Sequence, residues 1–131
     1  MTIHERTMVF GWENDGGIGE KLIQEIIDGT KTTTCALKAE YTVDQMQEVY
    51  RQVHERVTIL NKHGVPKVNV VVVDVYETTF GQPDSRLVEG EGYGRDIHGF
   101  QEAHRLAWGD LGVPLKEDTI LIVEQFKKID N

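Results

Sequence analysis

The amino-acid sequence predicts a single α+β domain, a small and mostly antiparallel β-barrel flanked by helices. Its 131 residues are 39% hydrophobic and 27% charged, a composition typical of one globular domain, so residues 1–131 form one predicted unit. Segments with helical periodicity alternate with short β-branched runs. The predicted strands are too few and too unevenly spaced for a doubly wound parallel sheet, which favours the barrel.

The first predicted helix covers residues 17–28. Between Ile18 and Ile27, apolar residues recur at intervals of three and four, and Gly29 follows where a C-terminal cap belongs. The glycine-rich stretch before this helix belongs to a class of loops that can cradle phosphates. Acidic residues accompany these glycines, so a turn that begins the helix is the favoured interpretation.

A strand, a second helix and a hairpin are expected next. The β-branched run at 32–35 predicts the strand, and Thr42 is a suitable N-cap for a helix that ends near His54. Residues 57–60 and 68–75 predict two strands joined by a tight turn. Four consecutive valines in the second of them favour a strand covered on both faces or one inside a closed barrel.

The last third of the chain is expected to form a long loop, a helix and a strand. Residues 81–96 are rich in glycine and predict the loop, and long ordered loops in compact domains are often functional. Asp96 can cap the helix, which is expected to end within 109–114. Residues 119–126 predict the closing strand, in which Glu124 is an acid within an apolar run.

Composition and charge restrict the function classes. The chain carries 22 acidic and 14 basic residues, a net charge of −8, so general attraction to DNA, RNA backbones or anionic membranes is not expected. Apolar runs fall short of the roughly 20 residues that span a bilayer, and the first residues do not resemble a signal peptide. A cytoplasmic protein is expected, and the single cysteine, Cys35, fits a reducing compartment.

Motifs for common cofactors and metals do not occur. The sequence has no P-loop, no nucleophile elbow, no HExxH and no GxGxxG after a strand, so no cofactor is expected. No metal site is expected either. Cys35 has no CxxC partner, and His98 and His104, six positions apart on one helix, point to different sides.

Lys31 and Thr34 are the first candidates for chemistry. In a strand they would face opposite sides, but in a turn after Gly29 their side chains could converge. A partly desolvated lysine can act as a general base, and a threonine hydroxyl can attack or position water. A buried Glu124 would require a partner, for which Lys31 is one candidate, and a solvated Glu124 is the alternative. Spacing alone also leaves open a solvated Lys31 beside ordinary strand threonines.

Five motifs occur in a fixed order along the chain. They are Gly29-x-Lys31-x-x-Thr34 after the first helix, Gly64-x-Pro66 in the hairpin, Glu89-Gly90-Glu91-Gly92 in the loop, His104 on the third helix, and Glu124-x-Phe126 in the last strand. This combination resembles the activating-signal-cointegrator homology (ASCH) family over residues 10–128. The resemblance implies a PUA-like β-barrel flanked by helices, with a cleft between the barrel and the first helix.

The resemblance also implies a function for that cleft. The family is associated with RNA or nucleotide binding, and some members are amidohydrolases that deacetylate N4-acetylcytidine with a lysine, a threonine and a glutamate. By motif position the catalytic residues are Lys31, Thr34 and Glu91, with Glu89 as the alternative glutamate. The residues expected to bind substrate are Gly29, Thr32, Glu89, Tyr93, Phe100 and His104.

Two alternatives stand beside the amidohydrolase. One is a noncatalytic RNA-binding module of PUA type, or a ribonuclease, in which Lys31, Arg86, Arg95 and Arg105 meet phosphates with strong salt dependence. The other is an interaction domain without a reaction. The acidic net charge favours a small neutral nucleoside over RNA as the ligand. The sequence predicts no oligomeric state.

Two departures from the family pattern affect the expected substrate. Many members carry a Trp–Arg pair where this chain has Phe100 and Gln101, so an aromatic ring is kept and a phosphate-binding guanidinium is lost. Many also have an aspartate where this chain has Tyr93. The resemblance places these positions around the mouth of the cleft.

Overall fold

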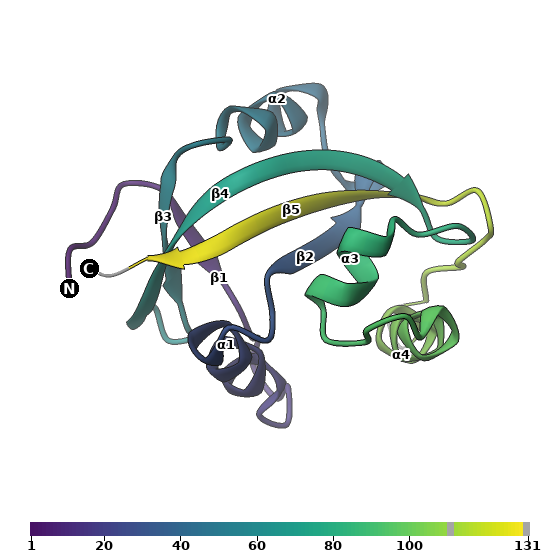
Figure 1. The fold of residues 1–131 in the computed structure, drawn as a ribbon, viewed down its shortest axis with the longest axis horizontal. Helices are drawn as coiled ribbons and strands as arrows, with labels where there is room; N and C mark the ends of the chain where they lie inside the picture. The colour runs from purple at the N-terminus through teal and green to yellow at the C-terminus, as the bar shows by residue number, and fades with distance from the viewer. Residues whose placement is uncertain (110–111, 130–131) are drawn as a thin grey trace.

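The computed structural model describes residues 1–109 and 112–129 and has an α+β fold (Figure 1). In chain order the elements are β1 (Thr7–Val9), α1 (Ile18–Asp28), β2 (Thr33–Leu37), the 3-10 helix η1 (Lys38–Glu40), α2 (Val43–Arg51), β3 (Arg56–Leu60), β4 (Pro66–Thr79), α3 (Ser85–Gly90), α4 (Ile97–Gly109) and β5 (Ile120–Ile129). In Figure 1, α1 and α2 flank the strands on opposite sides. No described helix is both long and apolar enough to cross a membrane.

The strands form one open sheet in the order β1-β3-β4-β5-β2. The parallel pair is β1 with β3, and the other neighbours are antiparallel, as predicted. Within the described residues β1 and β2 do not pair, so the sheet is not closed into the predicted barrel. The reason lies at these two edges, since β1 has only three residues and side chains such as Met8, Thr34 and Tyr41 line the space between the edges.

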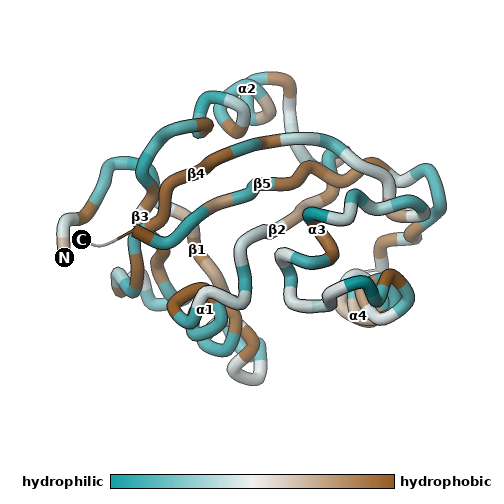
Figure 2. Tube along the Cα trace, in the orientation of Figure 1, coloured by the Kyte–Doolittle hydropathy of each residue, from teal (hydrophilic) through white to brown (hydrophobic). Residues whose placement is uncertain are grey.

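Side chains of β2 alternate between two hydrophobic clusters. Ala36 packs against the larger cluster, which includes residues of α1 and α2, whereas Cys35 and Leu37 pack in the smaller cluster with α3 and α4. Figure 2 shows hydrophobic residues concentrated along the strands and alternating with hydrophilic ones along α1. By the same alternation, Thr34 faces the larger cluster and Thr33 the smaller one.

Both early helices lie close to their predicted positions. α1 ends at Gly29, whose φ of 85° suits glycine and whose N–H caps the last carbonyl groups. α2 follows Thr42, which forms a capping box with Gln45. The helix ends at Arg51 rather than near His54, because His54 adopts a positive φ of 70°.

Three other predictions need correction. The segment 81–96 is not one long loop, because it contains α3, which starts where the Asp84 side chain accepts the N–H of Arg86. Strand β1 is unpredicted, since three residues are too few to show a period. The four valines of β4 are not covered on both faces, because Val72 is fully buried while Val73 is 39% exposed.

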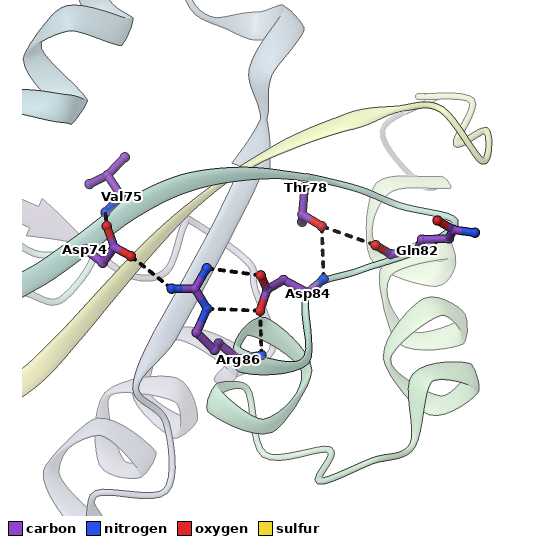
Figure 3. Close-up of polar contacts among 6 residues, drawn as sticks. All are labelled: Asp74, Val75, Thr78, Gln82, Asp84 and Arg86. Atoms are coloured by element: carbon purple, nitrogen blue, oxygen red, sulfur yellow. Dashed lines mark hydrogen bonds and ion pairs between the residues drawn. The ribbon is translucent and has the colours of Figure 1, made fainter.

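Arg86 anchors α3 to the sheet. Its guanidinium binds the Asp84 carboxylate through two N–H groups and Asp74 through another (Figure 3), and it lies 3.8 Å from the centroid of the Tyr76 ring. The Thr78 hydroxyl accepts the N–H of Asp84 and donates to a carbonyl oxygen of the same turn. These contacts fix the start of α3 and therefore the position of the residues that follow its end.

The glycine-rich stretch before α1 binds a carboxylate of its own. Asp15 accepts the N–H groups of Trp12, Gly17 and Gly19, and it pairs with Lys62 at 3.2 Å. The hydrogen bond from Gly17, with the others, holds the pKa of Asp15 far below its usual range. Since Asp15 already occupies this helix N-terminus, the interpretation as a turn is confirmed.

Candidate functional site

The ammonium group of Lys31 is buried against the carboxylate of Glu91. Nζ lies 3.2 Å from Glu91 Oε1 and donates to the carbonyl oxygen of Thr33 at 2.7 Å. Only 3% of the Lys31 side chain and 11% of the Glu91 side chain are exposed. The structure thus brings together two of the three residues expected to be catalytic, and Glu91, rather than the exposed Glu89, reaches the lysine.

Lys31 and Glu91 are each positioned by the end of a helix, α1 for Lys31 and α3 for Glu91. After α1, the N–H of Lys31 donates to the carbonyl oxygen of Glu25, which turns the chain toward β2. Glu91 directly follows α3, where Gly90 packs closely on Thr33. A β-carbon at Gly90 would lie 2.5 Å from side-chain atoms of Thr33, so only glycine lets the end of α3 approach β2 and direct Glu91 at the lysine.

Cys35 and His104 extend the cluster at the other oxygen of Glu91. Cys35 Sγ and His104 Nε2 each lie 3.5 Å from Oε2, and they are 3.8 Å from one another. His104 Nδ1 donates to the carbonyl oxygen of Phe100 at 2.8 Å, because a carbonyl can only accept. The imidazole packs between the rings of Phe100 and Trp108, with centroids 4.2 and 5.1 Å away. The ring is therefore held with Nε2 toward Cys35 and Glu91.

Burial and neighbouring charges set the protonation states of the cluster. Burial by itself opposes ionisation of Glu91, but the hydrogen bond with His104 and the charge of Lys31 outweigh it, so the pKa of Glu91 is lowered. Burial raises the pKa of the Cys35 thiol well above its usual value, and the Glu91 carboxylate adds to this effect. At neutral pH the cluster therefore holds an ionised Glu91 and a neutral thiol.

Thr34 lies on the other face of β2, in a pocket of about 170 Å³ between the edges of β1 and β2. Glu124 and the ring of Phe10 also line this pocket. Among the described residues, no hydrogen bond or ion pair joins Thr34 to Lys31 or Glu91. The Lys31 ammonium is 5.9 Å from the centroid of the Phe10 ring, so the buried pair lies next to the pocket at the start of β2.

Glu124 is the carboxyl group of this pocket. It is the cross-strand neighbour of Thr34, and no cation contacts it among the described residues. Burial raises the pKa of Glu124 to about 7. Glu124 is thus not paired with Lys31, and it is partly exposed where it lines the pocket.

Replacing Glu124 with glutamine is expected to stabilise the protein increasingly as the pH rises. The Glu124 carboxyl has an ordinary pKa of 4.5 and a pKa of about 7 in the folded chain. Between these values the folded state binds more protons than the unfolded state, so stability falls as the pH rises through this window. Glutamine does not titrate, so the advantage of Glu124→Gln should grow to about 3 kcal/mol above the window. Urea unfolding of both proteins at several pH values measures the difference in their free energies of unfolding. A difference that does not change with pH would contradict the raised pKa of Glu124.

The other residues expected to bind substrate have mainly structural contacts. Phe100 is completely buried, so it packs in the core and supports His104 rather than offering its ring to a ligand. Tyr93 meets Phe100 edge-on with centroids 5.9 Å apart. Gly29 is the exposed cap of α1, and Thr32 bonds through its backbone to the end of α3 and to β5.

Cys35 is the cluster residue that the sequence does not predict. Cys35 and Thr33 are two positions apart in one strand, so their side chains lie on the same face. A lone cysteine without a CxxC partner carries no motif, however, so only the fold brings it to Glu91 and His104.

Known proteins share this fold. Among solved structures, protein EF3133 from Enterococcus faecalis V583 matches with a TM-score of 0.74 and 16% identity, over 99% of this chain and 79% of that one. An ASCH domain from Lactobacillus crispatus JV V101 matches with a TM-score of 0.72 and 24% identity, over 95% of this chain and 80% of that one. Hypothetical protein PH0355 matches with a TM-score of 0.56 and 17% identity, over 94% of this chain and 97% of that one. At these identities the structures establish a common fold.

Sequence comparison identifies the family. No curated protein matches the chain. The model of the ASCH domain, in contrast, matches residues 7–130, nearly the whole length. This protein therefore belongs to the ASCH domain family.

Proposed function

We propose that this protein is an amidohydrolase that removes the acyl group from an acylated nucleoside, with N4-acetylcytidine as the first candidate. The observation that carries the proposal is the buried contact between Lys31 and Glu91, at two of the three positions where the resemblance expects catalytic residues. Buried ion pairs contribute little net stability, since desolvation offsets their attraction. A chemical role is therefore the better account of this pair.

In the proposed reaction, Lys31 is the general base and Thr34 the nucleophile. Lys31 first passes a proton to Glu91 and becomes a neutral amine. Thr34 Oγ1 then attacks the acyl carbon while its proton passes to this amine, and the C–N bond breaks as Lys31 gives that proton to the leaving amine. Water hydrolyses the acyl-threonine and releases the acid. Glu91 orients Lys31 and exchanges a proton with it between these steps. Catalytic hydrogen bonds often tighten only with substrate bound, so we expect substrate to bring Lys31 and Thr34 into contact.

The pocket beside Thr34 supports a small ligand. Its volume of about 170 Å³ is below the roughly 300–1,000 Å³ of sites for drug-sized molecules, which suits the base and acyl group of one nucleoside. With a pKa of about 7, Glu124 is partly a neutral acid at neutral pH and can donate a hydrogen bond to a carbonyl oxygen of the base. The pocket lies at the gap between β1 and β2, where we infer that the barrel of a PUA-like fold would close.

The distribution of charge favours a nucleoside over an RNA strand. The net charge is −8, and two of the arginines expected to meet phosphates are engaged within the protein. Arg86 pairs with Asp74 and Asp84, and Arg105 pairs with Glu102. RNA binding through these two arginines would thus require their ion pairs to break. A cytoplasmic location, which a lone reduced cysteine fits, is part of the same proposal.

The test is the release of acetate from free N4-acetylcytidine and from an RNA oligonucleotide that carries the same base. We expect turnover of the free nucleoside with little dependence on salt. Thr34→Val, which removes the hydroxyl while keeping the shape, should abolish turnover, and Thr34→Ser should retain part of it. If the nucleoside is not hydrolysed, and the RNA instead binds with an affinity that falls steeply with salt, the protein is a noncatalytic RNA-binding module and the proposal is wrong.

A further inference from the structure

Three side chains of the smaller cluster present metal-binding atoms to one point. Cys35 Sγ, Glu91 Oε2 and His104 Nε2 all lie within 4.8 Å of one another, and the individual separations are 3.5, 3.5 and 3.8 Å. We propose that these three residues form a binding site for a zinc ion. This site goes beyond the proposed amidohydrolase and does not depend on it.

The separations fit the geometry that zinc requires. Zinc is held tetrahedrally, with bonds of about 2.3 Å to cysteine sulfur and about 2.0–2.1 Å to histidine nitrogen and carboxylate oxygen. Three corners of such a tetrahedron lie about 3.3–3.6 Å apart. The observed triangle is within a few tenths of an ångström of these values, so an ion could enter with only small side-chain movements.

Contacts around the three residues hold the ligand atoms in position. His104 donates from Nδ1 to the carbonyl oxygen of Phe100, the kind of outer contact that orients metal-binding histidines and directs Nε2 at the ion. The Phe100 and Trp108 rings restrict rotation of the imidazole. Lys31 binds Oε1 of Glu91, which leaves Oε2 for the metal. Because these ligand atoms are already ordered before zinc binds, less of the binding free energy is lost in ordering them.

The chemistry of the donor set selects zinc. A sulfur, an imidazole nitrogen and a carboxylate oxygen together suit zinc better than magnesium or calcium, which prefer oxygen ligands. Three protein ligands leave a fourth position for water or a ligand, as in catalytic zinc sites. The Lys31 ammonium opposes the approach of a cation, while the negative charge of Glu91 attracts it. On binding, the Cys35 S–H bond breaks, the sulfur bonds to zinc, and the proton goes to solvent.

The test uses the purified full chain, stripped of metal with a chelator and then titrated with zinc or cobalt in the absence of any nucleoside. We expect one zinc ion per chain by equilibrium dialysis, with release of protons on binding, at least one of them from the Cys35 thiol. Cobalt should give the charge-transfer absorption of a cobalt–thiolate bond and the visible bands of a tetrahedral ion. Cys35→Ala should abolish the thiolate band, and His104→Gln should weaken binding by about 10-fold or more.

His98→Gln is the matched control, because His98 lies on the same helix and is exposed. This variant should bind zinc like the native protein, and circular dichroism should show that all variants are folded. The proposal is overturned if the native protein retains no zinc after dialysis, or if cobalt binds without a thiolate band and Cys35→Ala leaves binding unchanged. Because no substrate is present, this result is independent of whether N4-acetylcytidine is hydrolysed.

Discussion

Replacing Glu91 with alanine is expected to destabilise the folded state by about 3–5 kcal/mol. The change leaves the ammonium of Lys31 buried, with only 3% of its side chain exposed, and without its carboxylate. An uncompensated buried charge is among the most costly defects a single substitution can create. Urea denaturation followed by circular dichroism measures the loss.

Two further variants test whether the unpaired charge of Lys31 causes the destabilisation of Glu91→Ala. Glu89→Ala removes an exposed glutamate two positions away and should change stability by less than about 0.5 kcal/mol. Lys31→Met combined with Glu91→Ala removes both charges and should be more stable than Glu91→Ala alone, because no unpaired charge is then left buried. Equal costs for Glu89→Ala and Glu91→Ala would contradict the buried pair.

Replacing Gly19 with alanine is expected to cost about 3 kcal/mol or more, since the new methyl group would collide with rigid backbone. A β-carbon at Gly19 would lie 2.4 Å from the α-carbon of Gly11 and 2.8 Å from the carbonyl oxygen of Phe10. It would also press on the carboxylate of Asp15, which accepts the N–H of Gly19. The melting temperature is therefore expected to fall sharply.

Gly109→Ala is the control for the Gly19 variant. A β-carbon at Gly109 meets no atom within 4 Å, and alanine is the better helix former by about 1 kcal/mol in a helix interior. This variant should be neutral or slightly stabilising. If Gly19→Ala melts at the same temperature as Gly109→Ala, α1 does not pack against Gly11 as described.

The pairing of Lys31 with a glutamate of the Glu89-Gly90-Glu91-Gly92 segment is implied by the resemblance to the ASCH family, which leaves Glu89 open as the alternative to Glu91. Gly29 ends α1 and turns the chain so that Lys31 starts β2, and Gly90 permits the close packing on Thr33 that brings Glu91 to the lysine. The resemblance identifies both segments, but only the packing of Gly90 on Thr33 selects Glu91 over Glu89.

The remaining parts of the site depend on packing between distant segments. Cys35 is 56 residues from Glu91 and 69 from His104, so no local spacing encodes their separations. Thr34 and Glu124 become neighbours only through the register of β2 with β5. The raised pKa of Glu124 likewise follows from burial, which a single strand pattern does not determine.

The rate of acetate release from N4-acetylcytidine by Glu91→Gln, compared with Glu89→Gln, tests the central claim most directly. Glutamine keeps the size of Glu91 and an oxygen that can accept from Lys31, but it cannot exchange a proton with the lysine. We therefore expect Glu91→Gln to lose about 100-fold or more in turnover, while Glu89→Gln keeps the native rate. Equal rates for the native protein and Glu91→Gln would contradict a catalytic role for the buried pair.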